Sequence, residues 1–266
     1  MIDVIIFSKN RAAQLNMLLK SFKLFCKIES KVIVLYQETT EDFAAGYAKG
    51  VDSWDCFLCP EIDFKQDLID LYNTRKSPFV MFLVDDIVFT REVERNNKYF
   101  ETFKSNEQIL SYSLRMGKNI RYDYNNKKEI AVPKLTDVNI WKWKDVKYPG
   151  GWQYPMSLDG NIFRWEDIEK FILDGTYNNP NTFESYMAKH AVKGKPYMIC
   201  HDESRLVNVV LNRVQNKYKS RNMGVDLKEL NDKWLAGGEC KLANCSVERQ
   251  RDSVHAECVI DFEVQV

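Results

Sequence analysis

The stretch that decides the fold is Phe79–Thr90, FVMFLVDDIVFT. Six apolar residues follow Pro78 and run directly into two adjacent carboxylates, Asp85 and Asp86. An uninterrupted apolar run of this length is typical of a strand that is buried on both faces of a parallel sheet. We therefore predict a central strand over residues 79–84. Its two carboxylates would lie at the carboxyl edge of the sheet, where open α/β sheets bind their ligands.

The residues before this stretch predict the rest of a parallel sheet. Short β-branched runs at residues 3–7 and 31–36 are typical of buried strands. Between them, residues 8–25 carry apolar side chains at helical spacing, which predicts an amphipathic helix. Strand, helix and strand in this order form a right-handed βαβ unit. With a further strand near 55–58 and a helix near 67–72, the first 90 residues predict an α/β fold with a doubly wound sheet.

The second part of the chain predicts a less regular arrangement. Helices are predicted at residues 91–104, 166–173 and 182–190, and strands at 108–115, 155–163, 196–200, 206–211 and 257–266. Residues 116–145 are polar and aromatic and predict a long excursion. We expect one domain over residues 1–222, with a nucleotide-sugar half at about 1–105 and a smaller acceptor half at about 106–222. Residues 223–266 would form a C-terminal extension packed on it.

Composition excludes several classes of protein. Lys plus Arg and Asp plus Glu number 38 each, so the net charge of zero argues against a general nucleic-acid binder. No segment approaches the ~20 apolar residues of a membrane span, and the N-terminus lacks the features of a signal peptide. Seven cysteines without a regular framework favour reduced thiols and a cytoplasmic location. Cys56 and Cys59 form an isolated CxxC pair, for which ordinary buried thiols are the favoured interpretation.

Asp85 and Asp86 need a compensating charge. Two adjacent carboxylates repel each other and are costly to desolvate. A divalent cation such as Mn²⁺ or Mg²⁺ would remove this cost, since it binds a few carboxylate oxygens together with the phosphate oxygens of a ligand. The pair therefore predicts a metal that bridges the protein and a diphosphate. The alternative is that these residues cap the next helix or pair with Arg91.

The order of these motifs resembles the GT-A class of nucleotide-sugar glycosyltransferases, and within it family 2. SKNRAAQLNMLLKSF resembles the first βα unit of these enzymes, and VIVLYQET resembles their second strand. FLVDDIVF resembles the segment that carries their DxD signature. SLRMGKN and LNRVQNK extend the similarity to the small glycosyltransferase domains of chlorella-virus capsid-modifying proteins. The resemblance covers residues 1–220 by pattern and implies a Rossmann-like, mostly parallel sheet flanked by helices.

The resemblance also implies roles on the donor side of the site. Ser8 and Arg11 would lie near the nucleotide, and Tyr36 and Gln37 would hold its base. Asp86 would bind the metal and Asp85 would support it or contact the donor. Val84 stands where the signature usually has its first Asp. His201 would match a C-terminal metal ligand of some members, although a structural His is the alternative.

Two carboxylates are candidates for the catalytic base. Glu184 lies in NNPNTFESYM, which matches the acidic catalytic motif, and Asp159 lies in the bend LDG. Their alternatives are a helix N-terminal carboxylate favoured by the helix dipole and a turn residue before Gly. Trp152 and Tyr154 belong to an aromatic stretch, residues 141–155, that could stack on an acceptor sugar or pack in the core.

The sequence thus predicts metal-dependent, inverting transfer of a sugar from a UDP- or GDP-sugar to a hydroxyl of a glycan or glycoconjugate. The base would deprotonate the acceptor, and the cation would stabilise the leaving nucleoside diphosphate. A nucleotidyltransferase is disfavoured, because SKNRAAQ has no Gly-rich loop. The remaining alternative is a nucleotide- or carbohydrate-binding module of the same fold without activity. Nucleic acid is not an expected partner.

Overall fold

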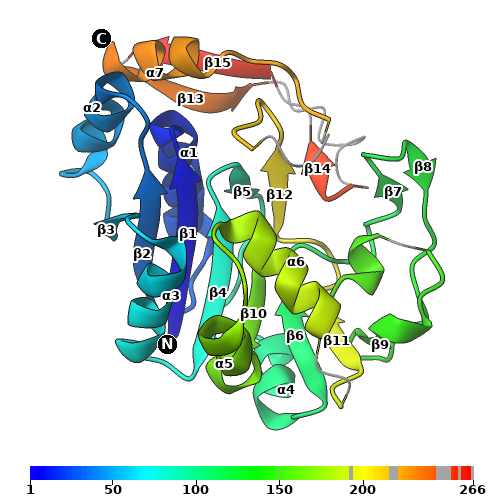
Figure 1. Ribbon diagram of the computed structural model, residues 1–266. Helices are drawn as coiled ribbons and strands as arrows, with labels where there is room; N and C mark the ends of the chain where they lie inside the picture. Colours follow the sequence, from blue (N-terminus) through cyan, green and yellow to red (C-terminus); the bar gives the residue numbers. More distant parts are fainter. Residues whose placement is uncertain (149, 192–193, 216–220, 244–252, 257–258, 265–266) are drawn as a thin grey trace.

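The computed structural model describes residues 1–148, 150–191, 194–215, 221–243, 253–256 and 259–264. An eight-stranded sheet in the order β3-β2-β1-β4-β10-β6-β11-β9 forms its centre (Figure 1). The strands are β1 (Ile2–Lys9), β2 (Ser30–Gln37), β3 (Phe57–Pro60), β4 (Phe79–Val84), β6 (Ile109–Ser113), β9 (Ile140–Lys142), β10 (Asn161–Arg164) and β11 (Tyr197–Cys200). The first four are mutually parallel, and β10 and β9 run antiparallel to their neighbours. The predicted mostly parallel α/β fold is confirmed.

Helices cover both faces of this sheet. They are α1 (Ala12–Phe25), α2 (Glu41–Gly50), α3 (Phe64–Asn73), α4 (Lys98–Ser105), α5 (Trp165–Asp174), α6 (Pro180–His190) and α7 (Leu227–Leu235). Side chains alternate across β1, so Val4 and Ile6 face the layer of α1 while Ile5 and Phe7 face α3, α5 and α6, which lie in front in Figure 1. Burial on both sides explains why the strands of the sequence are apolar without interruption.

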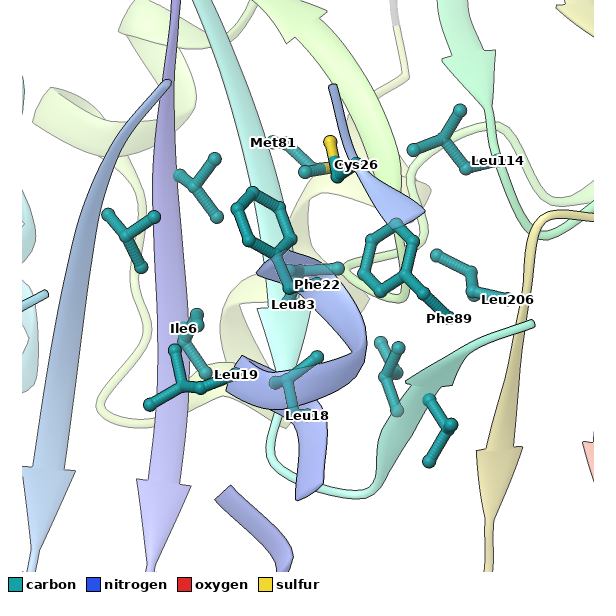
Figure 2. Packing of buried hydrophobic residues seen from close by; sticks show 14 of the residues in the cluster. Ile6, Leu18, Leu19, Phe22, Cys26, Met81, Leu83, Phe89, Leu114 and Leu206 are labelled. Atoms are coloured by element: carbon teal, nitrogen blue, oxygen red, sulfur yellow. The ribbon is translucent and has the colours of Figure 1, made fainter. Parts of the chain in front are cut away.

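The packing of α1 shows how helical spacing builds the core. Leu18, Leu19 and Phe22 point from one face of α1 toward Met81 and Leu83 on β4 (Figure 2). All five side chains are less than 9% exposed. The same cluster includes Phe89, whose ring meets that of Phe22 edge to face at 5.4 Å. This helix therefore fixes the position of the segment that follows Asp85 and Asp86.

Among the described residues, three smaller sheets accompany the central one. β5 (Ile87–Phe89), β12 (Leu206–Val209) and β14 (His255–Ala256) form one sheet, β13 (Gly238–Ala243) and β15 (Val259–Val264) a second, and β7 (Tyr122–Asp123) and β8 (Lys128–Glu129) a third. Short 3₁₀ helices occur at Trp143–Asp145 and Gly151–Gln153. The chain leaves the central sheet after Asp85 and Asp86, because β5 pairs with β12 and not with a central strand.

Two predicted elements are shorter than expected. The helix predicted at residues 91–104 begins only at Lys98, because the Val93 N–H donates to the Phe25 carbonyl and the Val93 carbonyl accepts from Lys27 N–H. The strand predicted at 155–163 begins only at Asn161. Before it, Gly160 has a φ of +81°, a left-handed conformation that turns the chain. The predicted long excursion at 116–145 contains β7, β8, β9 and the first 3₁₀ helix.

Helix α7, which follows residue 222, packs against the first βα units. In α7, the Trp234 ring lies parallel to that of Trp54, and its Nε1–H donates to the Gly46 carbonyl at 2.8 Å. Asn231 reaches α2 as well, where its side chain donates to the Asp42 carbonyl at 2.8 Å. A Cβ at position 46 would lie only 2.2 Å from the Asn231 Oδ1, so any other residue there would have to displace the Asn231 side chain. In the described ranges, no helix combines the length and apolar character needed to cross a membrane.

We predict that Trp234→Ala lowers the free energy of unfolding by about 3–5 kcal/mol, since it removes a buried indole and its hydrogen bond. The neighbouring substitution Leu235→Ala is the control; that side chain is 37% exposed, and its loss should cost less than about 1 kcal/mol. Urea unfolding of both variants measures the difference. Equal destabilisation by the two substitutions would contradict a fixed dock of α7 on α2.

Candidate functional site

Seven of the predicted site residues line one cavity of about 500 Å³ at the carboxyl edge of the sheet. They are Ser8, Arg11, Gln37, Asp85, Asp86, Asp159 and Glu184. The ends of β1 and β4 form one wall, whereas the N-terminus of α6 and the turn before β10 form another. The two carboxylate pairs, separated by some hundred residues in the sequence, therefore face a common space.

Asp85 is neutralised inside the protein. Its Oδ1 accepts from the Arg11 Nη1 at 2.8 Å, and its Oδ2 accepts from the Ser8 hydroxyl and the Lys9 N–H, each at 3.0 Å. Asp85 is 3% exposed and Arg11 is 7% exposed. Burial by itself lowers the pKa of the Arg11 guanidinium. The negative charges of Asp85 and Asp86 outweigh burial, so the pKa is raised overall. The adjacent carboxylates at the end of β4 are therefore tolerated because an arginine of the first βα loop pairs with one of them.

Arg11 also joins this edge to a distant part of the chain. Its Nε donates to the Asn212 Oδ1 at 2.8 Å and its Nη2 to the Asn212 carbonyl at 2.7 Å. All three nitrogens of the guanidinium are thus engaged, and Asn212, which also lines the cavity, is held against the sheet edge. The guanidinium acts here as an internal counter-ion that braces the cavity wall.

Asp86 is less completely neutralised. Its Oδ1 accepts from the Asn208 amide at 2.9 Å, but its Oδ2 is 3.6 Å from the Arg11 Nη1, too far for a hydrogen bond. Its side chain is 16% exposed. Burial raises the pKa of Asp86 to about 6, and the charges of Asp85 and Asp159 add to this effect against that of Arg11. Asp86 therefore lies in the cavity as a carboxylate that would gain from an added positive charge.

A divalent cation fits Asp86 only if a ligand supplies most of its oxygens. Within the described ranges, no three His, Cys, Asp or Glu side chains are grouped so that they could hold a metal by themselves. Asp85 has its oxygens committed to Ser8, Lys9 and Arg11. Mg²⁺ is commonly bound by one or two carboxylates together with substrate phosphates. Asp86 is suited to that arrangement, which agrees with a site shared with a diphosphate.

Glu184 and Asp159 belong to the wall formed by α6 and the turn before β10. Glu184, near the N-terminus of α6, accepts from the Leu158 N–H at 2.9 Å. Asp159 pairs with Arg115 through a 2.8 Å contact between its Oδ2 and the Arg115 Nη1. Burial raises the pKa of Glu184 to about 7, and the charge of Asp159 adds to the shift. A carboxylate with a pKa near neutrality can accept a proton at physiological pH and hold it afterwards, as a general base requires.

His201 is not brought to the cavity, so its predicted place among metal ligands is wrong. It is fully buried between Tyr112 and Arg205. Its Nδ1 accepts from the Arg205 Nη2 at 2.9 Å, and its Nε2 is hydrogen-bonded to the Tyr112 hydroxyl. Burial and the Arg205 charge lower the pKa of the imidazole to about 3. Both ring nitrogens serve the core, which matches the structural alternative.

The aromatic candidates also lie apart from the cavity wall. Trp152 is 1% exposed, packs edge to face on Trp141 and donates from its Nε1 to the Ile120 carbonyl at 3.1 Å. It is a core residue and not an acceptor platform. Tyr154, two residues later, is half-buried and is not among the residues that line the cavity. Tyr36 packs on Tyr47 with ring centroids 4.6 Å apart, whereas Gln37, on the other side of the strand, faces the cavity.

Several residues that line the cavity, or that contact a lining residue, were not assigned a role from the sequence. Asn208 contacts Asp86, Asn212 contacts Arg11, and Arg115 contacts Asp159. Two of them lie in motifs quoted for the resemblance, SLRMGKN and LNRVQNK, so the signal was present without a function attached. His255 is different, because no motif surrounds it, yet it is the histidine that lines the cavity.

Comparison with known proteins supports one class of enzyme. No family model matches the chain. It is 29% identical over 252 residues to a bifunctional glycosyltransferase, pgtA, of Dictyostelium discoideum, which covers 82% of this chain and 33% of that protein. The chain therefore spans about a third of the length of the curated relative it matches.

The fold has a counterpart among solved structures. A crystal structure of Staphylococcus aureus TarS, residues 1–349 in complex with UDP, superposes with a TM-score of 0.50 at 12% identity. The match covers 89% of this chain and 70% of that one. It supports the α/β fold with a large, mostly parallel sheet, and the similarity to pgtA supports the predicted enzyme class. The chain is thus similar in sequence to part of a glycosyltransferase; the similarity to chlorella-virus domains stays a prediction.

Proposed function

We propose that this chain transfers a sugar from a nucleoside-diphosphate sugar to a hydroxyl of a glycan or glycoconjugate, with inversion at the anomeric carbon. The observation that carries the proposal is the two-sided cavity. The strand-end carboxylates Asp85 and Asp86 lie on one wall, and Glu184 and Asp159 lie on the other. Similarity to pgtA supports the class of reaction, and the UDP complex of TarS makes UDP the first nucleotide to test before GDP.

Glu184 is the proposed general base. One of its oxygens accepts from the Leu158 N–H, which orients the carboxylate toward the cavity. Its raised pKa lets it take the proton of the acceptor hydroxyl while that oxygen attacks the anomeric carbon. The bond to the diphosphate breaks in the same displacement, and the electron pair leaves with the diphosphate. Asp159 supports this role, because its negative charge keeps the proton affinity of Glu184 high.

The other wall suits the leaving group. Lys9, Arg213 and Arg221 line the cavity and would attract a diphosphate by their charge. Asp86 would hold Mn²⁺ or Mg²⁺, which would supply positive charge beside the leaving nucleoside diphosphate. Asp85, fixed by Ser8 and Arg11, keeps the end of β4 in place. Gln37 and Glu61, at the ends of β2 and β3, extend the cavity toward a position suited to the base of the nucleotide.

The first test is binding of UDP by calorimetry with and without Mn²⁺. We expect Asp86→Asn to weaken metal-dependent binding at least about tenfold, since it removes the carboxylate charge but keeps the size of the side chain. Asp52→Asn, an exposed residue outside the cavity, should bind as the unmodified chain does. Metal-independent binding of both UDP and GDP would refute the cation at Asp86. Binding with no transfer or hydrolysis of any sugar nucleotide would favour the inactive binding module.

The second test is the transfer rate of Glu184→Gln. Glutamine keeps the acceptor for the Leu158 N–H but cannot take a proton, so we expect kcat to fall about 10²- to 10⁴-fold with little change in UDP affinity. In the unmodified chain, the rate should decline as pH falls below about 7, because Glu184 becomes protonated. If Glu184→Gln retained full activity, Glu184 would not be the base, and Asp159 would be the next candidate.

The same substitution should stabilise the fold at high pH. The folded pKa of Glu184, about 7, lies above the unfolded value, so the folded chain binds more protons between about pH 4.5 and 7 and loses stability as pH rises through this window. Glu184→Gln should therefore raise the free energy of unfolding by about 1–3 kcal/mol at pH 8 and by little at pH 4.5. Urea unfolding at the two pH values measures this; an equal effect at both would contradict the raised pKa.

A further inference from the structure

A short chain of contacts links the C-terminal part of the molecule to the proposed base. The Arg115 Nη2 is 3.0 Å from the His255 Nε2, and the Arg115 Nη1 is 2.8 Å from the Asp159 Oδ2. Asp159 in turn acts electrostatically on Glu184. His255 lies in β14, far along the chain from the other three residues, and it lines the same cavity.

The contact with Arg115 defines the state of His255. A guanidinium can only donate, so the His255 Nε2 accepts and the ring is neutral with its proton on Nδ1. Burial and the charge of Arg115 lower the pKa of His255 to about 3, which agrees with a neutral ring. The ring is held by Tyr124, whose centroid lies 5.7 Å away, and by the pairing of β14 with β12 at Asn208. His255 therefore offers a fixed acceptor to Arg115.

Arg115 needs such an acceptor. Its Nε is buried and, among the described residues, has no hydrogen-bond partner, so its terminal nitrogens define where the guanidinium lies. The charged groups that act on Glu184 across this wall are Asp159 and Arg115. A cation that moved from Asp159 toward Glu184 would stabilise the Glu184 carboxylate and make it a weaker base. Glu184 thus keeps its high proton affinity only while Arg115 is held on Asp159.

We infer that His255 is a positioning residue that holds Arg115 on Asp159 and so keeps the Glu184 carboxylate without a cation partner. The role of Glu184 rests on the proposed function, but the arrangement of the four side chains does not. The inference gives the C-terminal part of the chain a role in the site, because β14 brings the acceptor for the Arg115 Nη2.

The test is the pKa of Glu184, measured by NMR titration of ¹³C-carboxyl-labelled Glu, with Glu184→Gln to assign the signal. His255→Leu removes the acceptor at similar size, and we expect the Glu184 pKa to fall by about 1 unit or more as Arg115 turns toward it. His255→Gln restores an acceptor and should keep the pKa near that of the unmodified chain. An unchanged pKa in His255→Leu, or an equal fall in both variants, would overturn the inference.

A second measurement uses the unmodified chain, in case His255→Leu does not fold. The ¹⁵N shifts of His255 should show a neutral ring with the proton on Nδ1 from pH 5 to pH 9. A ring that is protonated at pH 5, or that carries its proton on Nε2, could not accept from Arg115 and would overturn the inference. Neither measurement needs a donor or an acceptor sugar. Failure to observe transfer would therefore count against the proposed function alone, and these titrations against the positioning role alone.

Discussion

The buried ion pair between Arg11 and Asp85 is the interaction on which the arrangement of the site depends. It joins the loop after β1 to the end of β4, and through Asn212 it adds the segment after β12. Removing one partner of such a pair leaves an uncompensated buried charge, which typically costs 3–5 kcal/mol. Because the guanidinium makes all of these contacts at fixed angles, three distant segments meet in one geometry, and Asp86 is left facing the cavity.

The carboxylates of Asp86 and Glu184 destabilise the folded chain when they are ionised. Burial raises the pKa of both Asp86 and Glu184, so each carboxylate costs free energy when it is ionised at neutral pH. Asp85 and Asp159 have arginine partners within hydrogen-bond distance, whereas Asp86 lies 3.6 Å from Arg11. Raised carboxylate pKa values in a cavity are a recurring property of functional sites, since reactivity requires groups whose charge the protein does not itself neutralise. The unfavourable electrostatics mark the two walls on which substrate and cation would act.

Sequence patterns correctly predicted the strands that are buried on both faces and the helix that is buried on one face. β1, α1, β2 and β4 occur at the expected residues because a strand covered on both faces must be apolar throughout and a helix covered on one face must be amphipathic. The pattern failed where backbone contacts to distant residues decide the conformation, as at Val93, or where one left-handed glycine bends the chain, as at Gly160. It also failed for Trp152, since an aromatic residue has the same appearance in a sequence whether it stacks on a ligand or on Trp141.

By itself, the sequence determined the α/β class, the place of Asp85 and Asp86 at the end of a central strand, and the candidates Glu184 and Asp159. These follow from local periodicity and from the order of motifs along the chain. Only the tertiary structure decided that Arg11 is the counter-ion of Asp85, that His201 serves the core, and that His255 reaches the cavity. The reason is physical: a side chain's charge partner and exposure depend on segments that are remote in sequence, and no local pattern records which of them will meet.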